Sequence, residues 1–248
     1  MKAKHIAIAI VALTAVGIGM TVGRRALRPA VAHVEVDRNV YPTRGIDVSA
    51  HNGEIDFNRV AADSIRFVYI KASEGGSWRD ASFERNYSKA TEAGLHVGAY
   101  HFFRFDVEGW RQSVNLLRAL GDKTLTMPVA IDVEEWGNPA PVSTDHVVDH
   151  LRSMIELLRQ NGREAVIYTN KNGYYRFIRG RFDDVGLWIC SFTTPPMPEN
   201  RRWTMWQHSH TGIVDGVPGP VDLITFNTPV RGTFDDWISR HPCISSLK

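Results

Sequence analysis

Eight short apolar segments, spread along most of the chain, are the feature that most limits how this sequence can fold. Each is six to eight residues long, and all but the segment at residues 204–209 contain Val, Ile, Phe or Tyr, which is typical of buried strands. The predicted strands cover residues 44–49, 66–73, 96–103, 127–134, 164–170, 187–192, 204–209 and 221–226.

Amphipathic stretches typical of helices lie between several of these strands, at residues 83–93, 107–120, 144–160 and 173–178. Such alternation predicts parallel βαβ units. The last three strands are joined instead by the Pro- and Gly-rich residues 193–202 and 211–220, which leave no room for full helices. The sequence therefore predicts an α/β fold, an irregular TIM-like (β/α) barrel with eight strands and about five helices, whose last strands lack helices.

The first 32 residues differ from the rest of the chain. They contain an uncharged apolar run over residues 6–22 and five basic residues but no acid. We expect residues 1–32 to be an N-terminal signal peptide or membrane anchor, residues 33–43 a linker, and residues 44–248 the barrel domain. One observation opposes export: the arginines after the run outnumber the lysines before it, and positive charge favours the cytoplasmic side.

The remaining chain is mildly acidic. The whole sequence has 29 basic and 27 acidic residues, so without the first five basic residues 24 remain, a net charge of −3. This balance gives no sign of a nucleic-acid partner. The two cysteines permit one disulfide, but Cys190 is expected on the inner face of its strand, far from Cys243, and a free thiol is favoured. His208 and His210 lack a third ligand at a suitable spacing, so we expect no metal. We also expect that the protein has no cofactor and is a monomer.

Two carboxylates stand two positions apart in the stretch MPVAIDVEEWG. Alternation along the strand turns Asp132 and Glu134 away from the apolar face, toward the barrel axis, with roughly 6.5–7 Å between their backbone positions. Asp47 on the first strand and Asp222 on the last point the same way, and closure of the barrel would make those strands neighbours. The four acids would then lie together at one end of the barrel, and their mutual repulsion would raise the pKa of at least one of them. A carboxyl group that keeps its proton near neutral pH can act as a general acid. The alternative is that these acids cap strands or bind backbone amides in turns.

Several aromatic side chains are expected at the same end of the barrel, where flat rings could pack against sugars and an amide could bind hydroxyl groups. Each of these aromatic residues could instead simply fill the core. The candidate substrate-binding residues are Tyr100, Tyr168, Trp188, Trp206 and Gln207.

An ordered series of motifs from about Arg44 to Trp237 resembles glycoside hydrolase family 25, the Chalaropsis-type lysozymes. The series includes RGIDVSAHNGEIDF, FVYIKASEG, AIDVE, AVIYTN, MWQHS and GPVDLITFN. The resemblance implies an exported N-acetylmuramidase with an irregular eight-stranded barrel. It also implies that Glu134 is the general acid, that Asp132 orients the 2-acetamido group of the substrate, and that Asp47 and Asp222 shape the charge of the site. Ala50, His208 and Ile224 depart from the family pattern without removing an acid.

Two acids on one strand approach a sugar from the same side, whereas a nucleophile must attack from the opposite face. The substrate's own N-acetyl oxygen can supply that nucleophile, so we expect substrate-assisted hydrolysis with retention. The expected partner is the glycan strand of peptidoglycan, in the periplasm or outside the cell, with membrane contact only through the N-terminal segment. The alternatives are a non-catalytic barrel that binds cell-wall glycan and an enzyme for another amino-sugar polymer.

Overall fold

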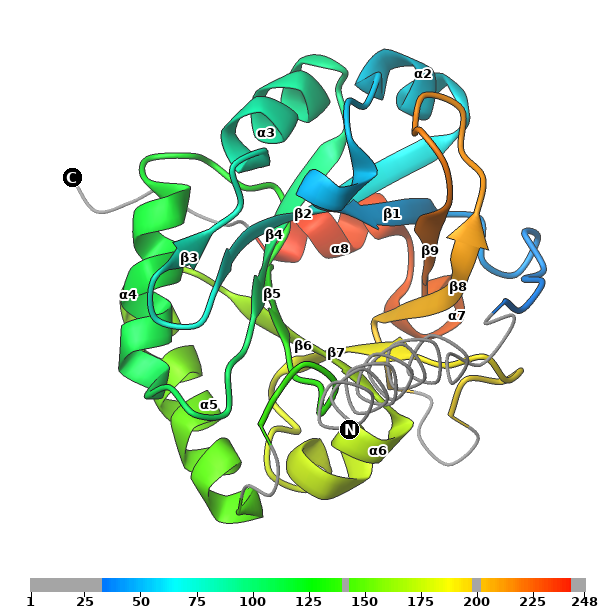
Figure 1. Ribbon diagram of the computed structural model, residues 1–248. Helices are drawn as coiled ribbons and strands as arrows, with labels where there is room; N and C mark the ends of the chain where they lie inside the picture. Colours follow the sequence, from blue (N-terminus) through cyan, green and yellow to red (C-terminus); the bar gives the residue numbers. More distant parts are fainter. Residues whose placement is uncertain (1–32, 140–142, 198–201, 242–248) are drawn as a thin grey trace, which may run out of the picture. The chain divides into compact units, whose positions relative to one another are not determined.

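The protein forms a closed barrel of eight strands, seen in the computed structural model, which describes residues 33–139, 143–197 and 202–241 (Figure 1). The strands of the barrel are β1 (Arg44–Val48), β2 (Ile65–Glu74), β4 (His96–Phe102), β5 (Val129–Asp132), β6 (Ala165–Asn170), β7 (Gly186–Cys190), β8 (Met205–Gly212) and β9 (Val221–Phe226). A two-residue strand, β3 (Trp78–Arg79), pairs with the end of β2 outside the barrel. All eight predicted strands are therefore present.

Within the barrel, neighbouring strands are parallel except at β9, which runs antiparallel to both β8 and β1. The connection from β8 to β9 contains only residues 213–220, too few for the crossover that a parallel strand needs. Sequence patterns did not reveal this reversal. As a result β9 begins at the end of the barrel where its neighbours β1 and β8 finish.

Helices cover the outside of the barrel, mainly along its first two thirds (Figure 1). The predicted helices correspond to α3 (Phe83–Glu92), α4 (Gly109–Leu120), α5 (Thr144–Gln160) and the pair α6 (Lys171–Gly173) and η2 (Tyr174–Ile178), the last of which is π-helical. Four short elements were not predicted: η1 (Ala50–Asn52), α2 (Phe57–Ala62), α7 (Thr228–Arg231) and α8 (Phe234–Arg240). No helix is described between β7 and β8 or between β8 and β9, which agrees with the prediction.

Two apolar layers hold the barrel together. The outer layer lies between strands and helices, and the inner layer fills the barrel with rings from Phe67, Tyr69, Trp188 and Phe226. Residue Gly98 makes room for one of these rings, since a Cβ there would lie 2.4 Å from a ring carbon of Tyr69. The helix α8 closes the inner layer, because its aromatic side chains Phe234 and Trp237 join this cluster.

Residues 33–43, the expected linker, lie against the barrel. The amide of Val34 donates to the carbonyl of His208 (2.8 Å), and the ring of Tyr41 packs beside Trp203 and Trp206. The predicted signal peptide or anchor, residues 1–32, is outside the described residues. Within the described ranges, no helix is both long enough and apolar enough to cross a membrane.

Candidate active site

Four acids meet at the end of the barrel where the parallel strands finish. Asp47 on β1 is directly opposite Asp222 on β9 in the strand register. Asp132 ends β5, between Phe102 on β4 and Tyr168 on β6, and Glu134 follows two residues later. Because β9 is antiparallel, its second residue reaches this end; on a parallel strand Asp222 would lie at the opposite end. We call this acid-lined end the mouth.

The pKa values show that the acids interact. Burial, followed by the charges of Asp222, Asp132 and Glu134, raises the pKa of Asp47 well above its usual range. The pKa of Asp132 is also raised well above its usual range, first by burial and then by Glu134. One buried oxygen of each, Oδ2 of Asp47 and Oδ1 of Asp132, makes no hydrogen bond within the described residues. Unpaired buried oxygens cost stability, so this arrangement is typical of a functional site.

Glu134 is oriented by the neighbouring strand end. Asn170, the last residue of β6, donates from Nδ2 to Oε1 of Glu134 (3.3 Å), while its own Oδ1 accepts from the amide of Gly173 at the start of α6. Burial raises the pKa of Glu134, and Asp222 adds to the increase, whereas the Asn170 hydrogen bond and His210 oppose it. A carboxyl group with a raised pKa, fixed in direction, can deliver a proton near neutral pH.

Known proteins share this architecture. Residues 46–217 match the sequence profile of the family described as glycosyl hydrolases family 25. The chain belongs to this family. It is 29% identical to the solved family 25 glycosyl hydrolase from Bacillus anthracis, with a TM-score of 0.75 over 86% of this chain and 98% of that one.

Two curated relatives extend the comparison. Lysozyme M1 from Streptomyces globisporus is 30% identical over 201 residues, which cover 74% of this chain and 67% of the relative. The uncharacterized protein YegX from Escherichia coli K12 is 33% identical over 210 residues, covering 82% of this chain and 76% of YegX.

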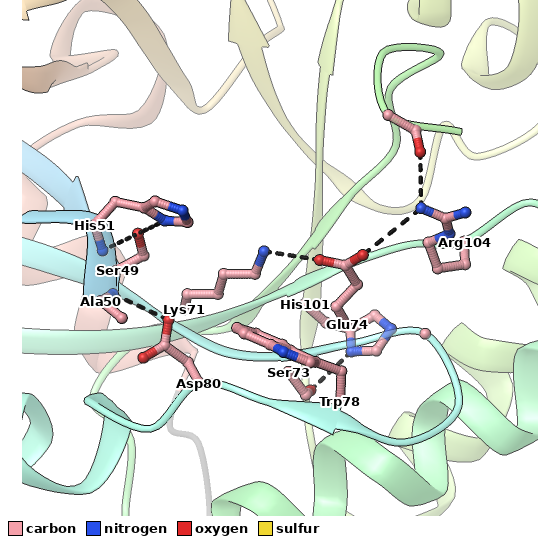
Figure 2. A network of polar contacts seen from close by, with 12 residues as sticks. Ser49, Ala50, His51, Lys71, Ser73, Glu74, Trp78, Asp80, His101 and Arg104 are labelled. Carbon is pink, nitrogen blue, oxygen red and sulfur yellow. Dashed lines mark hydrogen bonds and ion pairs between the residues drawn. The ribbon is translucent and has the colours of Figure 1, made fainter. Parts of the chain in front are cut away.

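A lysine lies beside the acids of this family 25 barrel and was missed from the sequence. Lys71 follows Phe67 and Tyr69 at alternate positions on the inner face of β2, so strand periodicity could have located it. Its charge opposes the rise in the pKa of Asp132. Figure 2 shows the Lys71 ammonium bonded to Glu74 (3.0 Å), with Arg104 on the other side of that carboxylate.

A histidine at the mouth was also missed. His210 lies with Nδ1 2.7 Å from Oδ1 of Asp222 and Nε2 3.9 Å from the sulfur of Cys190. His208, two residues earlier, faces the outer side of the barrel, where its Nδ1 contacts the carbonyl of Val34. Register shifts in β8 around Ser209 separate the two rings, and simple alternation could not have predicted this. Cys190 is a free, buried thiol, and burial raises its pKa.

Four of the five predicted sugar-binding residues lie on the inner side of the barrel. Tyr100 and Tyr168 lie near the acids: burial raises the pKa of each phenol, and the charges of Asp47 and Asp132 add to the increase. Gln207 faces the interior near His210. Trp188 is on the predicted face but lies deeper, only 2% exposed, between Tyr69 and Tyr168.

The placement of Trp206 at the mouth was wrong. Its ring is 1% exposed in the outer layer, and Nε1 donates to the carbonyl of Ser191 (2.6 Å). The reason is strand alternation: Gln207 faces inward, so the residue before it must face the outside of the barrel, where Tyr41 and Trp203 pack beside it.

Proposed function

We propose that this protein is a lysozyme of the N-acetylmuramidase type, which hydrolyses the β-1,4 bond between N-acetylmuramic acid and N-acetylglucosamine in peptidoglycan. The observation that carries the proposal is the pair Asp132 and Glu134 at the mouth, with carboxyl pKa values raised by burial and by neighbouring acids. Family membership supports it, and so do relatives named "Autolytic lysozyme", "Lysozyme M1" and "N,O-diacetylmuramidase".

Glu134 acts in this proposal as the general acid that protonates the oxygen of the leaving sugar. Its raised pKa keeps the proton available, and Asn170 fixes the direction of the carboxyl group. Proton transfer by a positioned group typically contributes about 10²–10⁴ in rate.

Asp132 acts as the partner of the substrate's 2-acetamido group. Because it shares an inner strand face with Glu134, it is poorly placed to attack the anomeric carbon from the opposite side. The acetamido oxygen attacks instead, and the Asp132 carboxylate stabilises the positive charge that develops on the acetamido nitrogen. Water then opens the cyclic intermediate, so the anomeric configuration is retained. Lys71 favours the ionised form of Asp132 that this role requires.

Asp222, which faces Asp47 across the strand pair, contributes negative potential, which favours the positively charged transition state of glycoside cleavage. The same charge helps to keep the proton on Asp47. The inner side of the barrel near the acids supplies polar groups for sugar hydroxyls, from Tyr100, Tyr168 and Gln207. We place the reaction outside the cytoplasmic membrane, where peptidoglycan lies.

Digestion of purified peptidoglycan tests the proposal. The expected result is new reducing ends on N-acetylmuramic acid, with the β-anomer formed first in proton NMR spectra recorded before mutarotation. New ends on N-acetylglucosamine would assign a different bond. Binding without any new reducing end would favour the non-catalytic alternative, and cleavage of chitin but not of peptidoglycan would favour another amino-sugar polymer.

The proposed location has its own test. A reporter that is active only after export, fused behind residue 40, is expected to give signal. A silent reporter would mean that the arginines after the apolar run keep the body in the cytoplasm.

A further inference from the structure

Exposed aromatic side chains are concentrated at one end of the barrel. The described residues contain four such side chains, and each follows the mouth end of a strand. They are Trp78 after β2 (46% exposed), Trp110 after β4 (53%), Trp136 after β5 (71%) and Tyr175 after β6 (45%). Since β2, β4, β5 and β6 are consecutive in the barrel, the four residues occupy one side of the mouth.

Exposed aromatic residues scattered singly are ordinary on protein surfaces, but a group of them beside a site indicates a binding surface. We call Trp78, Trp110 and Trp136 the tryptophan rim. The segments that carry them are β3, the first turn of α4 and the loop after β5, and hydrogen bonds join these segments.

The loop of Trp78 is attached to the helix of Trp110. Asn115 on α4 is 3% exposed, and its Nδ2 donates to the carbonyls of Glu74 (3.2 Å), Gly75 (3.0 Å) and Trp78 (2.9 Å). One buried amide thus fixes the backbone from which the Trp78 ring extends. The ring is held further by the ammonium of Lys71, which lies 4.8 Å from the ring centroid. Both side chains are labelled in Figure 2.

A second asparagine attaches the loop of Trp136 in the same way. Asn138 donates from Nδ2 to the carbonyls of Glu134 (2.8 Å) and Phe103 (3.0 Å) and accepts from the amide of Phe105 (2.8 Å). Arg104 joins this loop to the first, because its guanidinium donates to the carbonyl of Gly137 (2.7 Å) and lies 3.7 Å from Glu74. The exposed rings therefore extend from a fixed backbone, so binding a ligand would order little of the chain.

The side chains between the rings are charged in both signs. Arg104 and Glu74 lie between Trp78 and Trp136, and Glu108 and Arg111 (3.3 Å) flank Trp110. Flat apolar rings separated by hydrogen-bonding groups fit a ligand with apolar faces and hydroxyl or amide edges, which describes a sugar chain. A lipid surface would favour rings accompanied mainly by cations.

We propose that the tryptophan rim binds the glycan strand of peptidoglycan beyond the bond that is cleaved, so that the enzyme prefers long strands to short oligosaccharides. This inference rests on the proposed muramidase function. Its specific support is that the rim adjoins the acids. The ring of Trp78 lies beside Lys71, whose charge acts on Asp132, and Trp136 lies on the loop that follows Glu134.

The test compares two substrates with Trp78→Ala and Trp136→Ala. Each variant is expected to lose about 3- to 10-fold in kcat/KM on long, soluble peptidoglycan strands, the range expected for one aromatic contact. Cleavage of a tetrasaccharide of two disaccharide repeats should change less than 2-fold. The control is Val230→Ala: Val230 is also 46% exposed, but lies on α7, at the opposite end of the barrel.

A second measurement separates this inference from the proposed function. Glu134→Gln, alone and combined with Trp136→Ala, is titrated with the same long strands, so that binding is observed without cleavage. Weaker binding of the double variant supports the rim even if the wild-type protein proves inactive. Equal binding, or equal loss on both substrates, would overturn the inference. So would rim-dependent binding to phosphatidylcholine–phosphatidylglycerol vesicles without any effect on glycan, which would assign the rings to a membrane surface.

Discussion

The two ends of the barrel interior use the same inward-facing strand positions for opposite purposes. Along β2 the inner face passes from Phe67 through Tyr69 to Lys71, and along β9 it passes from Asp222 through Ile224 to Phe226. The closed end is filled with rings and covered by α8, while the mouth collects charges. One strand thus contributes stability at one end and chemistry at the other, and substitutions at the two ends should have separable effects.

The largest expected effect on stability comes from the closed end. Phe226 is fully buried, with its ring centroid 5.2 Å from that of Phe234 and 5.4 Å from that of Trp237. Phe226→Ala should lower the free energy of unfolding by about 3–5 kcal/mol, measured by urea denaturation. The rate per folded molecule should stay within about 2-fold of the wild-type rate. A rate that fell in proportion to stability would show that the two ends are not separable.

A substitution at the mouth should lower activity without lowering stability. Asp132→Asn keeps the shape of the side chain but cannot stabilise positive charge on the acetamido nitrogen, so turnover on N-acetylated strands should fall by about 10²–10³. The melting temperature should not fall, because the substitution relieves crowding among buried carboxyl groups. Cleavage at the wild-type rate would make Asp132 a structural residue and remove the main support for substrate assistance.

A smaller effect is expected in the pH dependence of stability. The pKa of Asp47 is raised in the folded state, so the folded protein keeps this proton to a higher pH than the unfolded chain does. From about pH 4, the usual value for aspartate, up to the raised folded value, the folded state binds more protons and stability falls as pH rises. Asp47→Asn removes this penalty, so its melting temperature should exceed that of the wild type by a margin that grows with pH.

Another group acts with the opposite sign in part of the same range. Burial lowers the pKa of His101 to about 4, so its contribution makes stability rise between pH 4 and about 6.5. The His101 contribution is present in both the wild type and Asp47→Asn, so it cancels in the difference between their melting temperatures. If that difference did not change with pH, the crowding of charges described at the mouth would be contradicted.

Periodicity made most of the fold and the four acids predictable. The alternation in Val129–Asp132 distinguishes the helix-facing side from the inner side, and barrel closure brings Asp47 beside Asp222. Hydrophobic pattern does not encode strand direction; the signal for the reversal of β9 was the length of the connection before it, which is too short for a parallel crossover. His210 was missed because register shifts in β8 change which side chains reach the mouth.

Strand alternation would also have corrected the prediction for Trp206 and located Lys71. Adjacent residues on a strand cannot both face the mouth, so predicting both Trp206 and Gln207 there was inconsistent with alternation. Lys71 continues the inner face of β2 and could have been found by the same rule. The tryptophan rim depends on which loops contact one another, which sequence spacing alone does not specify.

In the proposed mechanism, the inner face of β5 and of the residues that follow it carries the chemistry, with Glu134 as the proton donor. Its neighbour Glu135 is exposed and forms an ion pair with Arg176 at the surface, so the two glutamates provide a matched comparison. Glu134→Gln keeps the size and hydrogen bonding of the side chain but has no proton to give.

The decisive measurement is the rate at which the two variants cleave the tetrasaccharide, together with the affinity of each for glycan. For Glu134→Gln we expect a rate lower by about 10²–10⁴ with glycan binding retained, and for Glu135→Gln a rate close to that of the wild type. If Glu135→Gln abolished cleavage and Glu134→Gln spared it, the inner face of this strand would be assigned to the wrong residues and the proposed mechanism would fail.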